Sequence, residues 1–496
     1  MLKIKAVLIT GCLCVSACSV GPDFVRPSTD HLTTSAFLNK QNAQSENVHM
    51  GVWWQGFKDE ALNVSIETLL KQNLDMKQAG SRVLQAKETL RSSISGFLPT
   101  YSLAGDASRS GSPSSTGNRV YANNLSMTGS LSWQLDVFGK VRRSAESARA
   151  SFKASEYDAQ AVTHSLIAEL ISLRIQIAAG KRQAYLADDT FKNRERAHML
   201  LKQRYASGVN GVTSADVLLA SEAVSTAKAN VESAERTLKT LLFSYDVLLG
   251  HPIGSSLAEN IDFSLDEVPE AFAAGAPVSL LDRRPDLRAS ELRLKAANAN
   301  IGVAIADLYP SLTVGGSLGF TATEFSKLFR SEQIAGSIAA GLSQKLFEGG
   351  KLRAQIRLRK AQTDELIYAY TKTVLTALKE VETALMAEKT LQAERLALEA
   401  SLESMRTSEE IYYTRYTRGM VSLKTYLDIQ QSRLGVEQRY VTLVSEQWQQ
   451  RINLYLALGG DWFAVPEKAP KDDEDLDPAQ DMFFVHVERK ERHERG

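Results

Sequence analysis

Two similar segments of the sequence gather the charged, aromatic and glycine residues whose spacing could form a functional site. RYASGVNGVTSAD occupies residues 204–216, and RYTRGMVSLKTYLD occupies residues 415–428. Both contain an Arg-Tyr-x-x-Gly step, which ends at Gly208 and Gly419, and both close with a Thr-x-x-Asp step. Glycine often ends a helix because it adopts the left-handed conformation without strain. Each segment therefore predicts a turn between two helices, with ionisable groups beside it.

The two aspartates of these segments, Asp216 and Asp428, allow two interpretations. Each completes a possible capping box with a threonine three residues earlier, Thr213 or Thr425, and such a box needs only a helix N-terminus. Alternatively, carboxylates gathered at a constriction would attract cations and repel anions. The sequence leaves both interpretations open, and both can hold together.

The second segment carries the larger positive charge. Arg415 and Arg418 lie where the helix is expected to end, and the helix dipole favours basic side chains there. Lys424 follows the turn, whereas the first segment has uncharged residues at the places of Arg418 and Lys424. Tyr416 lies between the two arginines. If the two turns meet in an assembly, we expect the charge to lie mainly on the second one.

The sequence lacks the spacings that zinc and phosphate-loop sites require. Its seven histidines form no His-x-x-x-His pair and have no accompanying cysteine, so a zinc site is not expected. The Gly-Lys steps at 139–140 and 350–351 lack the other glycine and the Ser/Thr of a phosphate loop. We therefore expect no enzyme, no metal and no cofactor other than a covalent lipid. The 58 basic and 58 acidic side chains cancel, which argues against a nucleic-acid partner.

The N-terminus predicts an exported lipoprotein. Residues 1–17 combine two lysines, an apolar run and small residues, as in a secretory signal peptide. VSAC at residues 15–18 resembles a bacterial lipobox, which would leave Cys18 as a lipid-bearing first residue. Ser19 is not the aspartate that usually retains bacterial lipoproteins at the inner membrane, so we expect the outer membrane. A plain signal peptide with a chance cysteine is the alternative.

Three landmarks repeat at one offset of 211 residues, which predicts a tandem duplication. They are Pro99 and Pro310, the Gly-Lys steps at 139–140 and 350–351, and Arg204 and Arg415. After the signal peptide, the expected domains are a lipidated N-terminal segment (18–52), a first repeat (53–250), a linker (251–279), a second repeat (280–463) and a charged tail (464–496).

Hydrophobic periodicity predicts the same elements in both repeats. Alternation of apolar and polar residues predicts strands, which are expected at 101–108, 125–135, 311–320 and 334–347, with a polar loop at 109–124. Helical periodicity predicts one helix at 59–95 and two helices of about 100 Å at 1.5 Å per residue, at 140–205 and 351–418. Such long helices must pair, as antiparallel coiled coils, with returning helices at 213–247 and 422–457. The fold class is therefore mainly α with β.

Four strands per chain cannot close a sheet, and in a membrane each unpaired backbone group costs several kcal/mol. Two chains would give eight strands, which fill their own interior. Three chains would give a twelve-stranded barrel with an apolar outer face and a Ser/Thr-rich inner face. The alternative is that the strands form soluble hairpins. The uncharged, Gly/Ser-rich faces argue against that alternative, because exposed strands normally carry Lys or Glu.

With these features in place, the sequence resembles a known family, the outer-membrane factors (TolC-like channel proteins) of tripartite efflux systems, and within it the lipoprotein branch. The resemblance rests on VGPDFVRP after Cys18, WWQGFKDEALN at 53–63, the two Gly-Lys turns and, most specifically, LLDRRPDLRASELRLKAANANIGVAIADLYPSL at 280–312. It covers nearly all of residues 18–463. It implies a homotrimer whose twelve-stranded outer-membrane barrel continues into a periplasmic barrel of twelve helices.

The resemblance also implies a passive exit duct for small molecules such as drugs. The periplasmic end would open when a periplasmic adaptor and an energy-supplying inner-membrane pump dock. In the family, Tyr and basic residues of the second tip bond to polar residues of the first tip and hold the mouth shut. The gate residues expected on that basis are Asp216, Arg415, Tyr416, Arg418, Lys424 and Asp428. Arg418 departs from the family pattern, because it precedes Gly419 instead of following it.

Two rival functions share parts of this pattern. A lipidated periplasmic adaptor would be an elongated coiled-coil protein that forms no pore, but it normally carries one helical hairpin. This sequence predicts two hairpins, each after a membrane-style strand pair, which favours the duct. A duct for protein secretion shares the whole architecture, and here the lipobox and the RRPDL stretch favour small-molecule efflux.

Overall fold

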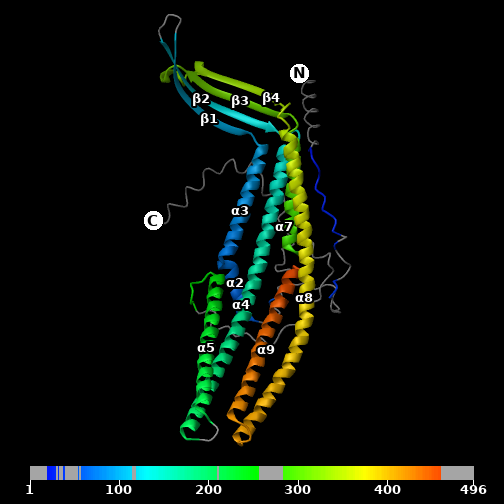
Figure 1. Ribbon diagram of the computed structural model, residues 1–496. Coiled ribbons are helices and arrows are strands. Elements are labelled where there is room, and N and C mark those ends of the chain that lie inside the picture. Colours follow the sequence, from blue (N-terminus) through cyan, green and yellow to red (C-terminus); the bar gives the residue numbers. More distant parts are fainter. Residues whose placement is uncertain are drawn as a thin grey trace.

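The chain forms a long molecule with a β-sheet at one end and helical hairpins at the other (Figure 1). The computed structural model describes residues 19–29, 32, 37–39, 54, 57, 59–113, 119–208, 212–255 and 283–459. The predicted signal peptide, Cys18, most of the linker and the whole tail at 464–496 lie outside the described residues.

Four antiparallel strands form one sheet in chain order: β1 (Thr100–Pro113), β2 (Arg119–Leu135), β3 (Ser311–Ala322) and β4 (Ile334–Ser343). The two predicted strand pairs are confirmed. The loop predicted at 109–124 is wrong, because β1 and β2 stay paired almost throughout it, with Arg109 opposite Asn123 and Pro113 opposite Arg119. The described Ser, Gly and Asn residues there, such as Ser110, Gly111 and Asn123, have the composition of a loop, yet each of them is paired in a regular ladder.

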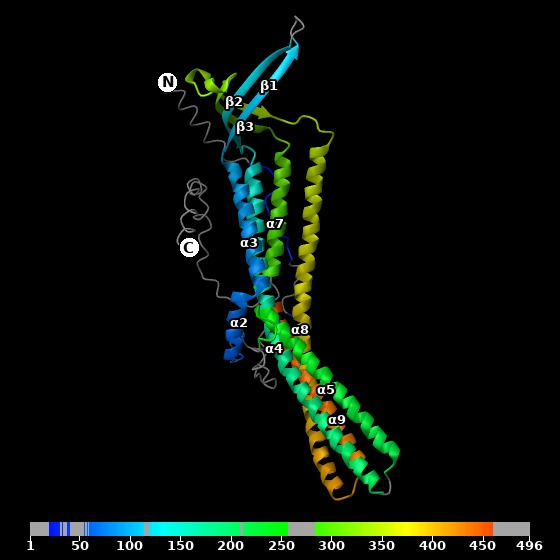
Figure 2. The ribbon, with the colours of Figure 1, turned by 90° about the vertical axis from the view of Figure 1, so that its left-hand side faces the viewer.

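The helices follow the predicted pattern with one break. They are α2 (Glu60–Gln72), α3 (Leu74–Ile94), α4 (Lys140–Ala206), α5 (Ser214–Leu249), α7 (Pro285–Ala306), α8 (Lys351–Thr417) and α9 (Leu423–Leu458). The two 67-residue helices, α4 and α8, confirm the predicted lengths. They return through α5 and α9 as antiparallel hairpins (Figure 2).

The single helix predicted at 59–95 is wrong, because it breaks at Asn73. The backbone of Asn73 leaves the helical region at φ −56° and ψ 135°. Its side-chain oxygen accepts a hydrogen bond from the Met76 backbone N–H at 2.9 Å, and its amide donates to the Leu248 carbonyl at 2.8 Å. Asparagine competes with helical hydrogen bonding in this way and so favours caps. The break starts α3 and fixes it to the end of α5.

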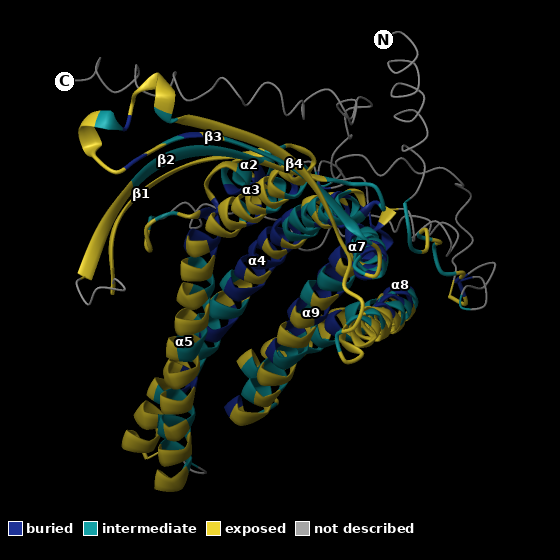
Figure 3. Ribbon diagram, turned by 90° about the horizontal axis from the view of Figure 1, so that it is seen from above, coloured by how far each residue is buried: buried dark blue, intermediate teal, exposed yellow. Residues whose placement is uncertain are grey.

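The main core lies at mid-length, where α2, α4, α5, α8 and α9 meet. Trp448, Tyr245 and Ile167 are buried there, and the Phe57 ring meets the Trp448 indole edge-on at 5.1 Å. Burying each large side chain contributes about 1.5–3 kcal/mol. An 18-residue window of α4 is apolar enough for a membrane span, but 61% of it is buried, as fits a core helix. Viewed from above, α5 is largely exposed, whereas α4 carries many buried residues (Figure 3).

The described N-terminal segment, residues 19–29, is fixed where the sheet meets the helices. The Val20 backbone N–H donates to the Phe138 carbonyl at 3.3 Å, just before α4 begins. The buried Arg143 guanidinium donates to the Val20 carbonyl at 3.3 Å and pairs with Asp23 at 2.8 Å. Gly21 lies against Gly302 of α7 so closely that a Cβ on Gly21 would be 2.5 Å from the Gly302 Cα. Two glycines are therefore needed where this segment crosses α7.

Replacing Gly139 by alanine should loosen this segment, whereas replacing Gly350 should not. Both glycines precede a long helix with positive φ, 79° and 86°, so each substitution costs about 1–2 kcal/mol of backbone strain. At Gly139 the new Cβ would lie 2.9 Å from the Ser19 Cα, whereas at Gly350 no described residue beyond its chain neighbours would lie within 4 Å of it. Limited proteolysis within residues 19–29 should accelerate about fivefold in Gly139→Ala, as expected for a loss of about 1 kcal/mol in local opening. Equal cleavage of the two variants would show that this contact does not hold the segment.

Candidate functional site

One face of the sheet is lined with hydroxyl groups and small residues. A row of directly paired serines crosses all four strands: Ser102, Ser130, Ser317 and Ser337. The last two are linked by a hydrogen bond of 2.8 Å between their Oγ atoms. Ser317 also lies in a Gly-x-Ser-x-Gly match at 315–319, the pattern of a nucleophile elbow. It lies within β3 and not at a strand-to-helix turn, so this match does not build a nucleophile.

The same polar face carries almost no charge. The rows next to the serines place Thr100 beside Ser132, and Ala104 beside Thr128. Asp106 is the only charged residue on this face of the four described strands. Such a surface can hydrate a wide passage without binding one charged solute tightly.

The opposite face is apolar and exposed. Its rows contain Leu103 with Leu318, and Leu131 with Ile338. Leu103, Leu318 and Ile338 are 69%, 65% and 91% exposed in the single chain. A soluble sheet would bury such residues, so this face needs an apolar partner such as lipid. Among the described residues, no strand pairs with the outer edge of β1 or of β4.

Aromatic residues lie at both ends of the apolar face. At the end near the helices, Trp133 donates its indole N–H to the Phe97 carbonyl at 2.9 Å, and Phe138 stacks on Tyr309 at 4.8 Å. At the other end, the ring of Phe320 in β3 meets the ring of Phe329 in the connection after β3, with their centroids 5.6 Å apart. Aromatic girdles at both edges of an apolar band are typical of transmembrane barrels.

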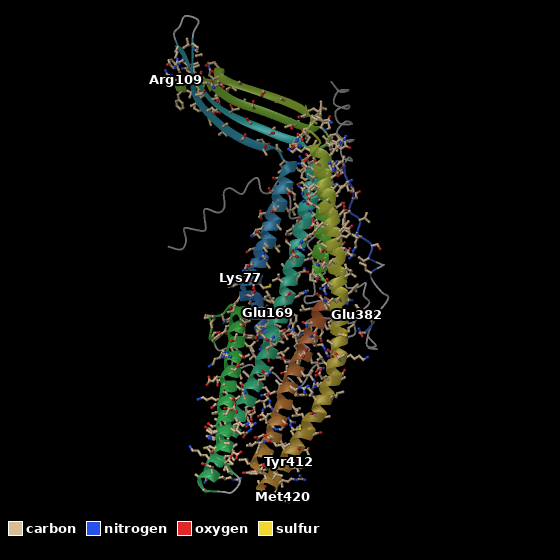
Figure 4. The ribbon with its side chains drawn as sticks, viewed as in Figure 1. Lys77, Arg109, Glu169, Glu382, Tyr412 and Met420 are labelled. Atoms are coloured by element: carbon tan, nitrogen blue, oxygen red, sulfur yellow. The ribbon has the colours of Figure 1, made fainter. Side chains whose placement is uncertain are left out.

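The hairpin tips lie at the end of the molecule opposite the sheet, where Figure 4 labels Tyr412 and Met420. Gly208 and Gly419 follow α4 and α8 with φ of 67° and 72°, as predicted for helix-ending glycines. Thr213 and Asp216 form the predicted capping box at the start of α5. Hydrogen bonds from the Thr213 side chain and backbone lower the pKa of Asp216 below its ordinary value.

The second predicted capping box, Thr425 with Asp428, is wrong. The N-cap of α9 is Ser422, whose side chain accepts a hydrogen bond from the Thr425 backbone N–H. The reason is a change of offset: Lys140 and Lys351 differ by 211, but Ser214 and Leu423 differ by 209, because the second tip connection is two residues shorter. The Thr-x-x-Asp echo is therefore not structurally equivalent. Asp428 instead pairs with Lys424 within α9 at 2.9 Å.

One predicted gate residue reaches the other hairpin. The Arg204 guanidinium of α4 donates to the Tyr416 hydroxyl of α8 at 3.4 Å and lies 5.9 Å from its ring centroid. Tyr416 in turn stacks on Tyr426 of α9 at 5.8 Å. Arg415 lies over Tyr412 of its own helix, and Arg418 is the C-cap residue that follows α8. Among the predicted gate residues, the structure thus joins Tyr416 to the first hairpin through Arg204.

Further links between the hairpins lie above the tips, and they could not be found from the sequence. Arg194 of α4 donates to Gln431 of α9 at 2.8 Å, and Arg182 of α4 pairs with the buried Glu437 of α9. Arg433 also pairs with Glu437, so one carboxylate accepts from two helices. The sequence alone does not show that Glu437 is buried or which residue it meets, because both depend on how the helices cross.

The RRPDL stretch, the most specific part of the sequence resemblance, forms a structural joint. Arg284 precedes Pro285 at the start of α7 and pairs with Asp286 and with Glu380 of α8, at 2.7 and 2.8 Å. It also donates to the Ala457 carbonyl near the end of α9 at 3.1 Å. Burial alone would raise the pKa of Asp286, but the hydrogen bonds and charge of Arg284 hold this pKa below its ordinary value. The motif therefore holds α7, α8 and α9 of the second repeat together.

The sequence model described as outer membrane efflux protein matches residues 65–251 and 276–460, so it covers both repeats. The chain belongs to the outer membrane efflux protein family. Two relatives have similar length: the probable efflux pump outer membrane protein TtgC of Pseudomonas putida is 30% identical, covering 90% of this chain and 94% of TtgC. Outer membrane protein OprJ of Pseudomonas aeruginosa is 29% identical, covering 92% of this chain and 96% of OprJ.

Solved structures of outer-membrane channels have the same fold. The outer-membrane channel OprN superposes with a TM-score of 0.78 at 29% sequence identity. The match covers 90% of this chain and 100% of the OprN chain. The Neisseria gonorrhoeae MtrE channel gives 0.78 at 25% identity, covering 90% and 99%. The chain is therefore an outer-membrane efflux channel protein with a strand-built membrane part and an α-helical barrel part. The adaptor alternative is wrong, since the matched relatives are the outer-membrane components.

Proposed function

We propose that three chains assemble into one sealed duct, the passive exit of a tripartite efflux pump. The observation that carries this proposal is the four-stranded sheet with one hydroxyl face, one apolar face and two free edges. Pairing β1 of one chain with β4 of the next removes every edge, as a membrane requires. Twelve strands leave a lumen, whereas eight would be filled by side chains.

The lipid proposed for Cys18 fits the position of the residue after it. Ser19 lies against Gly139, between the end of β2 and the start of α4. That place is the boundary between the membrane strands and the periplasmic helices. A lipid on Cys18 would start at this boundary and insert beside the barrel, so the chain would be anchored in the outer membrane and extend into the periplasm. Several acyl chains together give a firm anchor.

The duct is proposed to work without enzymatic activity or a cofactor. A periplasmic adaptor would bind the helical end, and an inner-membrane transporter would supply the energy. Relatives are named for a toluene efflux pump and for pyoverdine export, both of which concern small molecules. We extend that substrate class to this chain in preference to exported proteins.

The tip residues are proposed to close the duct at rest. The contact between Arg204 and Tyr416 joins the two hairpins at the last turn before the tips. The proposed gate also includes Asp216, Arg415, Arg418, Lys424 and Asp428, whose charges line the same end. Separating the tips would open the mouth.

Tyr416→Phe and Arg204→Gln should each raise the open probability of the reconstituted channel. Each removes the same hydrogen bond between the hairpins, worth about 0.5–1.5 kcal/mol, which corresponds to a change of roughly twofold to 13-fold in the equilibrium. Tyr412→Phe is the matched control, because Tyr412 contacts Arg415 of its own helix. Single-channel recording measures the effect, and Arg418→Ala and Asp428→Ala extend it to the other gate residues. Unchanged recordings for all four test variants would refute the gate at the tips.

A further inference from the structure

Basic side chains collect at the outer end of the apolar face, away from the helices. Arg109 of β1 lies opposite Asn123 of β2, in the next row on this face after Ala107 and Leu125. Figure 4 labels Arg109 at this end of the sheet. Arg119 lies further along the same face, opposite Pro113. The connection from β3 to β4, which contains the short turns Phe325–Lys327 and Ser331–Gln333, adds Lys327 and Arg330 at this end. We name Arg109, Arg119, Lys327 and Arg330 the outer collar.

The four cations of the outer collar exceed the nearby negative charge, because the β3–β4 connection contributes only two carboxylates, Glu324 and Glu332. The Arg109 guanidinium lies over the Tyr121 ring, 5.0 Å from its centroid, and Lys327 pairs with Glu324 at 2.9 Å. In the described part of the chain no carboxylate forms an ion pair with Arg109, Arg119 or Arg330. The connection at 114–118 contains no acidic residue in the sequence. Asp106 is near in sequence but belongs to the opposite face of the sheet.

Closing the barrel would concentrate this charge, a step that rests on the proposed trimer. Pairing β1 with β4 of the next chain brings Arg109 and Arg119 towards Lys327 and Arg330 in the β3–β4 connection of that chain. The four cations then outnumber the two carboxylates of this connection, Glu324 and Glu332. Like charges side by side cost free energy unless an anion lies between them. Below the collar lies the apolar band, and beside it Phe325 and Phe329 are 72% and 59% exposed. The site therefore offers cations at headgroup level above an apolar surface at acyl-chain level.

We propose that the outer collar binds the phosphate groups of the phosphorylated glycolipid in the outer leaflet of the outer membrane. Arginine binds phosphate through paired N–H donors, and each basic residue near a membrane surface adds about fivefold to the binding of anionic lipid. A free phosphate ion would use the cations but leave the apolar band and the two exposed phenylalanines unused. The lipid occupies both parts of the site.

The test is native mass spectrometry of the full-length assembly in detergent, titrated with lipid A that carries both phosphates or with lipid A stripped of them. The wild-type assembly should bind the phosphorylated form about tenfold more tightly. Arg109→Gln/Arg330→Gln should lose most of this preference. The control Lys202→Gln/Lys228→Gln removes the same charge from exposed positions of α4 and α5 and should keep it. Inorganic phosphate at equal concentration should not displace the lipid.

Each outcome decides the proposal. Three results would overturn it: the wild-type assembly binds the two lipids equally, inorganic phosphate displaces the lipid, or Arg109→Gln/Arg330→Gln keeps the full preference for the phosphorylated lipid. If the double variant fails to assemble, the comparison of the two lipids on the wild-type protein still decides. A conducting trimer without phosphate preference refutes only the outer collar, whereas a non-conducting monomer refutes the proposed duct as well.

Discussion

Leu131→Arg should abolish accumulation of the assembled channel in the outer membrane. Leu131 lies on the apolar face, in the row with Tyr101 and Ile338, near the middle of the band. An arginine facing lipid near the midplane costs about 2–4 kcal/mol. A threefold assembly would bear this cost three times, which is comparable with the whole stability of a typical domain.

Ser130→Arg is the matched control, since it places the same side chain one residue away on the opposite face. Ser130 belongs to the serine row that would line the lumen. The variant should assemble normally, and its added positive charges should shift ion preference towards anions. Membrane fractionation and reversal potentials measure the two effects. Normal assembly of Leu131→Arg together with loss of assembly in Ser130→Arg would mean that the faces are assigned the wrong way round.

Arg451→Met should destabilise the helical region by about 3–5 kcal/mol, the cost of leaving a buried charge without its partner. Arg451 of α9 and Glu388 of α8 have side chains only 3% and 5% exposed. The Arg451 Nε donates to a Glu388 oxygen at 3.1 Å, and a second guanidinium N–H donates to the other oxygen. Nearby, burial raises the pKa of Tyr455 to about 12, so this phenol stays neutral and adds no second negative charge beside Glu388.

The double variant Glu388→Met/Arg451→Met separates this electrostatic effect from a packing effect. Removing both charges should recover most of the stability, because an apolar pair of similar volume is often as stable as a buried ion pair. Glu235→Gln, which breaks the exposed pair with Lys239, should cost less than about 1 kcal/mol. Guanidinium unfolding followed by helical circular dichroism gives the free energies. A double variant as unstable as Arg451→Met would show that packing, not charge, dominates.

The strongly periodic parts of this fold could be predicted from the sequence. The alternation of apolar and polar residues around Leu131 predicts a strand, and the uninterrupted helical pattern after Lys140 predicts a long helix. Each prediction depends only on local sequence, and the structure has both elements, β2 and α4. The offset of 211 residues between Lys140 and Lys351 extended these predictions to the second repeat. The loop prediction for residues 109–124 was wrong because residue composition does not show whether backbone groups are paired.

Contacts between the hairpins could not be predicted, because they depend on how long helices rotate and cross. The pairs of Arg204 with Tyr416 and of Arg182 with Glu437 join residues more than 200 positions apart. A one-residue change in helix register would remove both. The wrong capping box at Thr425 has a related cause. The second tip connection is two residues shorter than the first, so an offset of 211 residues no longer relates equivalent positions after the turn.

The most direct measurement of the central claim is single-channel recording of the purified full-length protein in a planar bilayer, with the mass of the assembly determined on the same sample. We expect the mass of three chains and discrete conductance steps, as a twelve-stranded barrel with a hydrated lumen requires. A stable monomer that produces no conductance would contradict the account, because four strands with two free edges cannot form a sealed duct.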